Sequence, residues 1–385
     1  MKIHSKLPHS ETSIFSVMSA LAREKNAINL GQGFPDYTCD PKLISLVEHY
    51  AKSGHNQYSP MAGAPKLRKA IVDKINIQYK HHLNPDTQVC VTAGATQALF
   101  TAFQAFINKG DEVIIIEPAY DSYKPSIQLA GGVPISYRLT YPDYKIDWEA
   151  FSQLITEQTK MIVINTPHNP TGSTLKRSDL QTLERLTKDT DIIILSDEVY
   201  EHLIYDGQEH QSVLRFPELL ERSIATYSFG KTLHATGWKV GYCVGSESLI
   251  AEFKNIHQWN VFSVNSFLQL AIAEYLQDTS VYQSLPNFFQ RKRDLLQSAL
   301  KDSKLKPIPS EGTYFQLYNY EGMSDLDDLA FAKKLTELSG VATIPLSPFY
   351  SDPPGDKVVR FCYAKEDTTL LAAGEKLCSI DTLLR

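Results

Sequence analysis

Short apolar, β-rich runs alternate with helical patterns through the middle of this 385-residue chain. The runs lack a regular polar alternation, so each is expected to form a strand that is buried on both faces. Strands that alternate with helices build a largely parallel sheet with helices packed on its faces. The expected strands are residues 88–92, 112–117, 161–165, 192–195, 224–229 and 240–244, and helices are expected at 96–108 and 178–188.

The pattern changes in the last third of the chain. Two long helical stretches are expected first, at 247–277 and 286–301. Strands at 313–317, 341–345 and 357–363, with helices at 326–339 and 370–383, then indicate a smaller α+β unit. The segment before about Cys39 shows no strand of its own, and we expect it to pack against this unit. We therefore predict an α/β fold with a large domain at 40–285 and a small domain formed by residues 1–39 and 286–385.

The composition argues against several classes of protein. A net charge of −6 disfavours the basic face that nucleic-acid binding requires. The sequence has no apolar run of the length that crosses a membrane, and its first twenty residues lack the pattern of a secretory signal. The five cysteines are scattered, and none forms a C-x-x-C pair, so neither a disulfide framework nor a metal site is indicated. We expect a cytoplasmic protein that has no metal and binds neither nucleic acid nor membranes.

Polar residues follow two of the expected strands at the sheet edge where open α/β folds bind ligands. Asn169 lies in a Pro- and Gly-rich stretch that is typical of turns in general, but it could also donate to a phenolate-like oxygen. Asp197 could cap a turn, or its charge could keep a ring nitrogen protonated in a dry pocket. Tyr200, three residues later, can face the same ligand.

Lys231 also follows an apolar strand, in a stretch rich in Gly, Ser and Thr. A single lysine is usually a solvated surface residue. A desolvated lysine, or one beside another cation such as Lys239, has a lowered pKa and becomes a nucleophile toward a carbonyl carbon. Ser228 and Lys239 could neutralise a phosphate, and the turn through Gly94 into a helix offers free N–H groups for the same anion. No Walker A loop and no G-x-G-x-x-G fingerprint is present, which disfavours an unrelated nucleotide-binding enzyme.

Taken together and in this order, these motifs resemble the class I and II aminotransferases over almost the whole chain. Residues 30–36, 56–58, 166–170, 228–231 and 359–362 resemble the kynurenine and glutamine aminotransferase branch. Residues 257–265 are more similar still to the bacterial methionine aminotransferases of that branch. The resemblance implies an aspartate-aminotransferase-like fold, a pyridoxal 5'-phosphate (PLP) cofactor, and a homodimer with shared active sites. It also implies a two-step transfer of an amino group from an amino acid to a 2-oxo acid.

The resemblance assigns roles to residues at matching positions. Lys231 would hold PLP as a Schiff base and move the substrate proton, and Asp197 would pair with the ring nitrogen. Asn169 and Tyr200 would bind the phenolic oxygen, and Tyr120 would stack on the ring. The residues expected around the phosphate are Ala95, Thr96, Ser228, Lys239 and Tyr58, the last from the neighbouring subunit. The residues expected around the substrate are Arg360, as the clamp for its carboxylate, with Asn169, Gly33, Phe34, Tyr37 and Phe262.

The substrate expectation follows from the same positions. Thr96 and Ser263 replace an aromatic residue and a histidine of the animal kynurenine enzymes. No second arginine motif is present for a side-chain carboxylate, so methionine, glutamine and aromatic amino acids are the expected donors. The alternative is a kynurenine and glutamine aminotransferase with cysteine-conjugate β-lyase activity, because the same cofactor permits elimination when a leaving group sits at Cβ. We also expect residues 31–37 to close over the substrate, since they place pocket residues on a Gly- and Pro-rich loop.

A non-catalytic reading is the effector domain of a transcription regulator built on the same fold. It would require a DNA-binding domain upstream, whereas only about forty residues precede the first pocket motifs. We therefore expect an enzyme.

Overall fold

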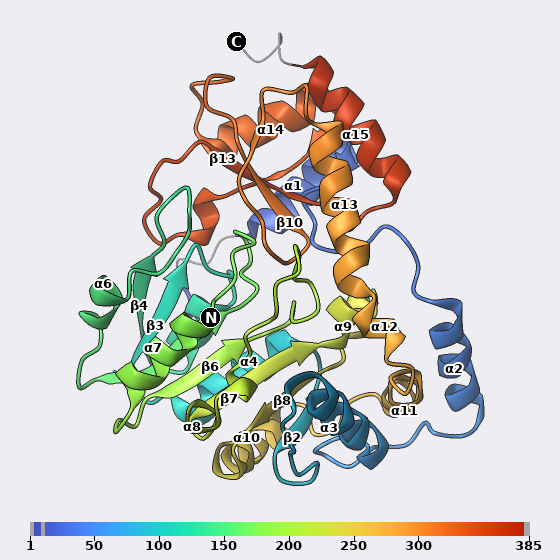
Figure 1. Ribbon diagram of the computed structural model, residues 1–385, viewed down its shortest axis with the longest axis vertical. Coiled ribbons are helices and arrows are strands. Elements are labelled where there is room, and N and C mark those ends of the chain that lie inside the picture. The colour runs from blue at the N-terminus through green and yellow to red at the C-terminus, as the bar shows by residue number, and fades with distance from the viewer. Residues whose placement is uncertain (1–3, 9–11, 381–385) are drawn as a thin grey trace.

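A computed structural model describes residues 4–8 and 12–380 of the protein (Figure 1). Figure 1 shows a large sheet with its helices in the lower part of the molecule and a smaller α+β unit above it. Helix α13 (Leu285–Ala299) runs between the two parts and packs on α15 (Asp367–Ser379). No helix within the described ranges is long and apolar enough to cross a membrane.

The large sheet has seven strands and is mostly parallel. In spatial order it contains β2 (Val89–Thr92), β8 (Gly241–Gly245), β7 (Ser223–Ser228), β6 (Ile193–Asp197), β5 (Thr159–Asn165), β3 (Glu112–Glu117) and β4 (Val133–Arg138). Only β8 runs antiparallel to its neighbours. All six strands expected from the apolar runs are present, and the central strands are almost entirely buried. Strand β4 was not predicted, because it is a half-exposed edge strand without a continuous apolar run.

Helices cover both faces of this sheet. They are α2 (Pro41–Lys52), α3 (Pro65–Tyr79), α4 (Ala95–Phe106), α5 (Tyr123–Leu129), α6 (Trp148–Ser152), α7 (Arg177–Thr187), α8 (Pro217–Leu220), α9 (Phe229–Thr232), α10 (Glu247–Asn260), α11 (Ser266–Tyr275) and α12 (Ser280–Gln283). The helices expected at 96–108 and 178–188 are therefore present as α4 and α7.

The single helix expected at 247–277 is wrong, because the chain breaks between α10 and α11. Phe262 has a φ of 65°, a left-handed conformation that no regular α-helix contains. The side chain of Asn265 then accepts a hydrogen bond from the N–H of Leu268 and caps the start of α11. Helices α10 and α11 are therefore separate elements, with residues 261–265 between them.

The small unit is built from both ends of the described chain. Strands β12 (Ile344–Pro345), β13 (Val358–Cys362), β10 (Phe315–Asn319) and β9 (Lys306–Pro307) form an antiparallel sheet, with α14 (Asp328–Ser339) and α15 beside it. Helix α1 (Ile14–Glu24) contacts β11 (Val341–Ala342) and α14, so the N-terminal segment packs on this unit as expected.

The expectation that this N-terminal segment lacks a strand is wrong. Strand β1 (Ile28–Asn29) pairs in parallel with β11, a contact too short to leave a periodic pattern in the sequence. The helix expected at 370–383 begins at Asp367, and residues 381–383 lie outside the described ranges. The domain boundaries at 40–285 and at the two ends stay a prediction.

The sheet order decides where the polar motifs meet. Strands β5, β6 and β7 are parallel neighbours, so Asn165, Asp197 and Ser228 all lie at one edge of the sheet. This carboxyl edge is where open α/β sheets bind ligands.

Candidate active site

A cavity of about 310 Å³ lies at this edge, between the large sheet and strands β10 and β13. Eleven of the residues predicted for the site line it: Gly33, Ala95, Thr96, Tyr120, Asn169, Asp197, Tyr200, Ser228, Lys231, Lys239 and Arg360. The remaining lining residues are Phe15, Gln32, Leu99, Asn165, Val199, Thr236 and Phe315. Residues that are up to 345 positions apart thus surround one space of small-molecule size.

Asp197, the last residue of β6, supplies a buried carboxyl group. Its Oδ2 accepts a 2.5 Å hydrogen bond from the hydroxyl of Tyr123, and its Oδ1 a 3.4 Å bond from the N–H of Val199. Burial raises the pKa of Asp197 to about 6, although the hydrogen bond from Tyr123 opposes that rise. A buried carboxylate of this kind is suited to a cationic ring nitrogen as its partner.

Lys231 lies in α9, directly after β7, and its amine faces the cavity. The Nζ atom donates to the hydroxyl of Tyr314 at 2.8 Å and to the carbonyl oxygen of Gly33 at 3.4 Å. Burial, assisted by the nearby cations Lys239 and Arg360, lowers the pKa of Lys231 to about 8, while Cys362 and Asp197 oppose the fall. A lysine with this pKa is partly neutral at physiological pH and can attack a carbonyl carbon.

The start of α4 forms an anion cradle on the same side of the cavity. Gly94 has a φ of 79°, and a Cβ atom there would lie 3.4 Å from Cε and Nζ of Lys239. The close approach lets Lys239 reach the first N–H groups of α4, at Ala95 and Thr96, which have no partner inside the helix. Together with Ser228, these groups fit a phosphate.

Arg360 on β13 closes the opposite side and is 0% exposed. Its Nη1 donates to Oδ1 of Asn169 at 2.7 Å and its Nη2 to the carbonyl oxygen of Gly31 at 3.1 Å. The ring of Phe315 lies 3.8 Å from the guanidinium carbon, and Nε of Arg360 has no hydrogen-bond partner within the described structure. Burial lowers the pKa of Arg360 to about 10, so the side chain stays charged at neutral pH.

Four predicted residues do not line this cavity. Tyr58 is 82% exposed, and its ring contacts that of Phe262, which is also exposed. Tyr37 packs edge-on against Phe288, and its hydroxyl is buried without a partner in the described residues. The ring of Phe34 is partly exposed and faces the ammonium of Lys365 at 5.0 Å. The exposed pair Tyr58 and Phe262 lies on the surface, whereas Tyr37 is part of the packed interior.

Several residues of the site were not predicted, among them Tyr123, Tyr314 and Phe15. Tyr123 binds Asp197, Tyr314 binds Lys231, and Phe15 of α1 lines the cavity and lies 5.3 Å from the guanidinium carbon of Arg360. Each reaches the site through a contact between distant segments, and each reads locally as an ordinary apolar position. No helical spacing links Tyr123 to the predicted Tyr120, because Tyr120 lies before α5, which begins at Tyr123.

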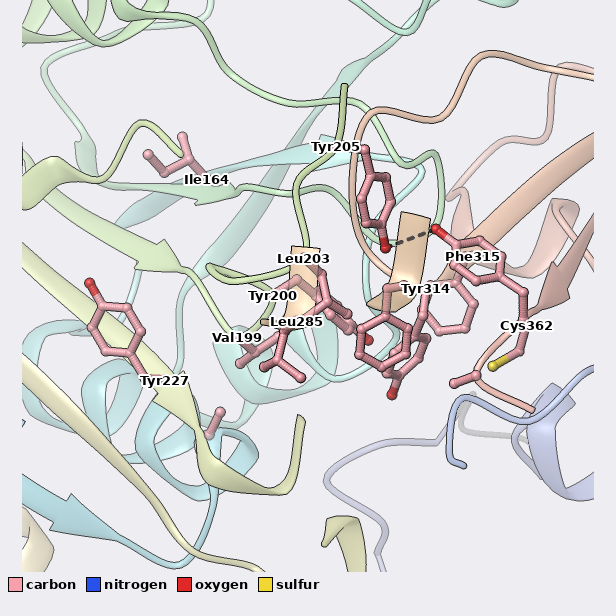
Figure 2. Packing of buried hydrophobic residues seen from close by; sticks show 14 of the residues in the cluster. Ile164, Val199, Tyr200, Leu203, Tyr205, Tyr227, Leu285, Tyr314, Phe315 and Cys362 are labelled. Atoms are coloured by element: carbon pink, nitrogen blue, oxygen red, sulfur yellow. Dashed lines mark hydrogen bonds between the residues drawn. The ribbon is translucent and has the colours of Figure 1, made fainter. Parts of the chain in front are cut away.

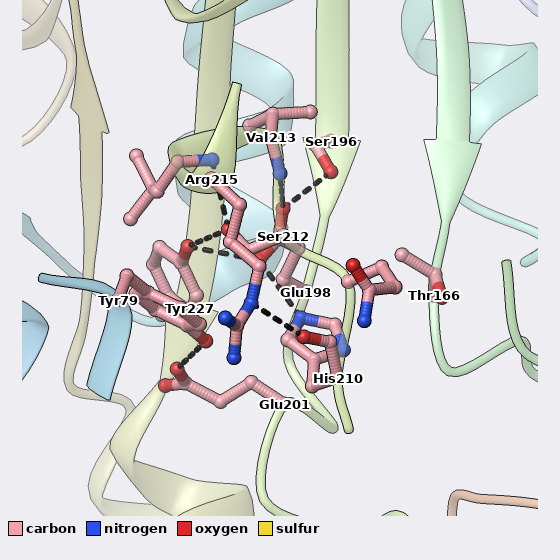
Figure 3. A network of polar contacts seen from close by, with 12 residues as sticks. Tyr79, Thr166, Ser196, Glu198, Glu201, His210, Ser212, Val213, Arg215 and Tyr227 are labelled. Carbon is pink, nitrogen blue, oxygen red and sulfur yellow. Dashed lines mark hydrogen bonds and ion pairs between the residues drawn. The ribbon is translucent and has the colours of Figure 1, made fainter. Parts of the chain in front are cut away.

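A buried polar network lies behind the loop that carries Asp197 and Tyr200 (Figure 3). Glu198 accepts hydrogen bonds from Ser196, Tyr227 and the N–H of Val213 at 2.8, 2.9 and 3.1 Å. Glu201 accepts from Lys74 at 2.6 Å and from Tyr79 at 2.8 Å. The loop is therefore fixed on its far side by two fully satisfied carboxylates.

No group of three His, Cys, Asp or Glu side chains that could hold a metal ion occurs within residues 4–8 and 12–380. The charged side chains that line the cavity are those of Asp197, Lys231, Lys239 and Arg360.

Comparisons with known proteins identify this arrangement. The family model for aminotransferase class I and II matches residues 25–377. The chain is 46% identical to a methionine aminotransferase of Escherichia coli, with 97% of each chain covered, and 35% identical to kynurenine–oxoglutarate transaminase 1 of Mus musculus, with 93% of each covered. The solved structure of YbdL from Escherichia coli, whose reactivity identified a methionine aminotransferase function, matches with a TM-score of 0.97. It is 46% identical and covers 98% of this chain and 100% of its own.

These matches confirm both the family resemblance and the fold that the motifs predicted. The chain has the aspartate-aminotransferase-like fold and belongs to the class I and II aminotransferase family.

Proposed function

We propose that the protein is a PLP-dependent aminotransferase that takes the α-amino group of methionine, and also of glutamine or aromatic amino acids, and transfers it to a 2-oxo acid. The observation that carries the proposal is one cavity that combines Lys231, with its pKa lowered to about 8, the buried carboxyl of Asp197 and the buried guanidinium of Arg360. Family membership supports it, since the class I and II aminotransferases depend on PLP.

The residues present fit the cofactor. The start of α4, Ser228 and Lys239 would hold its phosphate, and Asp197 would pair with the ring nitrogen. Asn169 and Tyr200 would bind the phenolic oxygen, and Tyr120 would lie against the ring. Bound PLP supplies an electron sink for the negative charge that develops at the substrate Cα atom.

The chain's own residues would then orient the substrate and move its proton. Arg360 would bind the α-carboxylate through two parallel N–H donors. Its Nε has no hydrogen-bond partner within the described structure and could supply one of them. Lys231 would take the proton from Cα as a neutral amine and return it as an ammonium group. Phe15, Leu99 and Phe315 give the cavity an apolar part of its lining, which would limit the water around the proton transfer.

The same lining supports an apolar or weakly polar donor. Arg360 is the single arginine among the described residues that line the cavity, and the two lysines there are assigned to the cofactor, so no guanidinium remains for a second carboxylate. The names of the two similar relatives, a methionine aminotransferase and a kynurenine–oxoglutarate transaminase, point to methionine first and to aromatic donors next.

We also propose a homodimer with shared active sites. Tyr58, Phe262 and Trp259 are large, strongly exposed aromatic side chains, and Tyr58 contacts Phe262. Their burial against a second copy would bring Tyr58 to the phosphate in that copy's cavity. Co-expression of Lys231→Ala chains with Tyr58→Phe chains should then give mixed dimers with one intact site, whose activity exceeds that of either variant alone.

The deciding experiment follows the absorption spectrum of purified protein with PLP before and after methionine is added, without a 2-oxo acid. Conversion of the lysine-bound cofactor band to the pyridoxamine phosphate band supports the proposal. Conversion with kynurenine but not with methionine would indicate that the donor is the one named for the second relative. Release of pyruvate from a cysteine S-conjugate would show an additional β-lyase activity. Absence of any lysine-bound band in wild-type protein, or its presence in Lys231→Ala, would overturn the proposal.

A further inference from the structure

The free amine of Lys231 rests in a defined position, and the proposed function gives that amine a second task. During proton transfer the amine must stay near the substrate without a covalent bond to hold it. A flexible four-carbon side chain loses rotamer freedom when it is fixed, so a specific partner is needed to keep it in place.

Tyr314 provides that partner. Its hydroxyl lies 2.8 Å from Nζ of Lys231, and the same hydroxyl donates a short hydrogen bond to the carbonyl oxygen of Gly33. The three groups form a chain in which the ammonium donates to the tyrosine oxygen and the tyrosine proton is directed at the backbone carbonyl. The ring of Tyr314 also lies 5.3 Å from Nζ, which adds a cation–π contact.

The position of Tyr314 is rigid. The residue is 1% exposed, and its ring packs edge-on against those of Tyr200 and Phe315 at centroid distances of 5.1 and 4.9 Å (Figure 2). Gly33 approaches this cluster closely, because a Cβ atom on Gly33 would lie 2.7 Å from Cζ of Phe315. The absence of a side chain at residue 33 is thus what lets its carbonyl reach the tyrosine.

We propose that Tyr314, oriented by the carbonyl of Gly33, is a positioning residue that holds the free amine of Lys231 beside the substrate. The inference rests on the proposed function for its role in catalysis, but the contact itself exists in the protein without it. It also ties the amine to residues 31–37, since Gly33 lies in that segment and Lys365 holds the next residue through a 2.7 Å bond to the carbonyl of Phe34.

Lysine labelling tests the contact without any need for turnover. Full-length protein freed of cofactor is methylated with formaldehyde and cyanoborohydride across a range of pH, and Lys231 and Lys239 are quantified by mass spectrometry. The Tyr314→Phe variant loses the acceptor that favours the ammonium form, so the pKa of Lys231 should fall. Since the pKa of Lys231 is about 8, a fall of about half a unit to one unit raises its neutral fraction at pH 7 by about three- to fivefold, and labelling should rise by the same factor while Lys239 labels as before.

Tyr205→Phe is the matched control. Tyr205 is equally buried, and its hydroxyl donates to the carbonyl oxygen of Thr313, one residue before Tyr314, but it does not contact Lys231. Tyr205→Phe should label at the wild-type rate. An unchanged pH profile for Tyr314→Phe overturns the proposal, and so does an equal rise in both variants, which would indicate a general loosening of the aromatic cluster.

A second measurement uses the loaded enzyme and connects the contact to catalysis. With α-deuterated and ordinary methionine, Tyr314→Phe should lower kcat by about tenfold, leave KM nearly unchanged and increase the deuterium isotope effect, since the amine that takes the Cα proton is less well placed. A loss confined to KM contradicts the role. Failure of wild-type protein to bind PLP would remove the proposed function, yet the labelling comparison would still decide whether Tyr314 holds Lys231.

Discussion

The hydroxyl of Tyr123 donates a 2.5 Å hydrogen bond to Oδ2 of Asp197. Tyr123 begins α5 and Asp197 ends β6, so the contact joins two elements that are 74 positions apart in sequence. Both groups are buried, which raises the pKa of Tyr123 well above its usual value and keeps the phenol a donor. The bond therefore favours the ionised form of a carboxyl group that burial alone would keep protonated.

Tyr123→Phe should shift the acid side of the kcat/KM profile upward. The activity requires the Asp197 carboxylate, and loss of one hydrogen bond to a charged group is worth about 1–2 pKa units. Protonation of Asp197 would then begin at a higher pH, so activity falls earlier as the solution is acidified. Tyr137→Phe on β4, whose hydroxyl bonds the backbone of Asp147, is the control. An acid limb that stays in place would contradict this role for Tyr123.

Asp197→Asn should stabilise the cofactor-free protein while it abolishes transamination. The pKa of Asp197 rises from 3.8 to about 6 on folding, so between these values the folded state holds a proton that the unfolded state has lost. Stability therefore falls as pH rises through this window, and the loss is complete above pH 6. The neutral asparagine does not ionise and so avoids this loss. The free energy of unfolding of the variant should exceed that of the wild type by about 2–3 kcal/mol at pH 7.5. Urea unfolding measures the gain, which should vanish near pH 3.5; an equal gain at both pH values would assign it to packing.

The apolar runs made the fold predictable because buried parallel strands need continuous hydrophobic sequence on both faces. Strand β4 and the two-residue β1 lacked that signal, one because it is half-exposed and the other because it is too short. The break between α10 and α11 was also not predicted, because the left-handed conformation of Phe262 does not change the hydrophobic periodicity of the sequence.

The candidate site divides in a similar way. Residues in local motifs, such as Lys231 and Asp197, were predicted by their place after a strand and by the family resemblance. Tyr123 and Tyr314 were not, because their roles come from contacts across 74 and 83 positions of sequence. From sequence alone, a buried tyrosine cannot be distinguished from an ordinary core residue until the partner of its hydroxyl group is known.

Arg360→Lys should weaken amino-acid binding more than it slows chemistry. The guanidinium is held by Asn169 and Gly31 in a plane that suits a two-pronged contact with a carboxylate, and a lysine ammonium offers a single point charge in its place. We expect a loss of about 2–4 kcal/mol in binding of a non-reactive carboxylate analogue, measured by calorimetry. Spectroscopic binding of PLP should be unchanged. An unaltered analogue affinity would place the carboxylate elsewhere.

Lys74→Met should destabilise the protein, because Glu201 loses its cation. It should also loosen the loop that carries Tyr200. Lys74 on α3 and Glu201 are 2% and 3% exposed and meet at 2.6 Å. Burial raises the pKa of Glu201, but the attraction and hydrogen bond of Lys74, together with the nearby His202 and His210, outweigh that rise and lower the pKa to about 2. This depressed pKa contributes stability above the unfolded value of 4.5, and that stability is lost as pH falls toward 2.

Removing the lysine leaves a buried carboxylate without its cation, at a cost of about 3–5 kcal/mol in the free energy of unfolding at pH 7. The matched control is Lys69→Met on the same helix, which breaks the exposed pair with Asp73 at 2.7 Å and should cost less than about 0.5 kcal/mol. Urea denaturation at pH 7 compares the two. Because Glu201 follows Tyr200, Lys74→Met should also speed amide hydrogen exchange in residues 197–203. Equal costs for both variants would show that the buried pair contributes no more than a surface one.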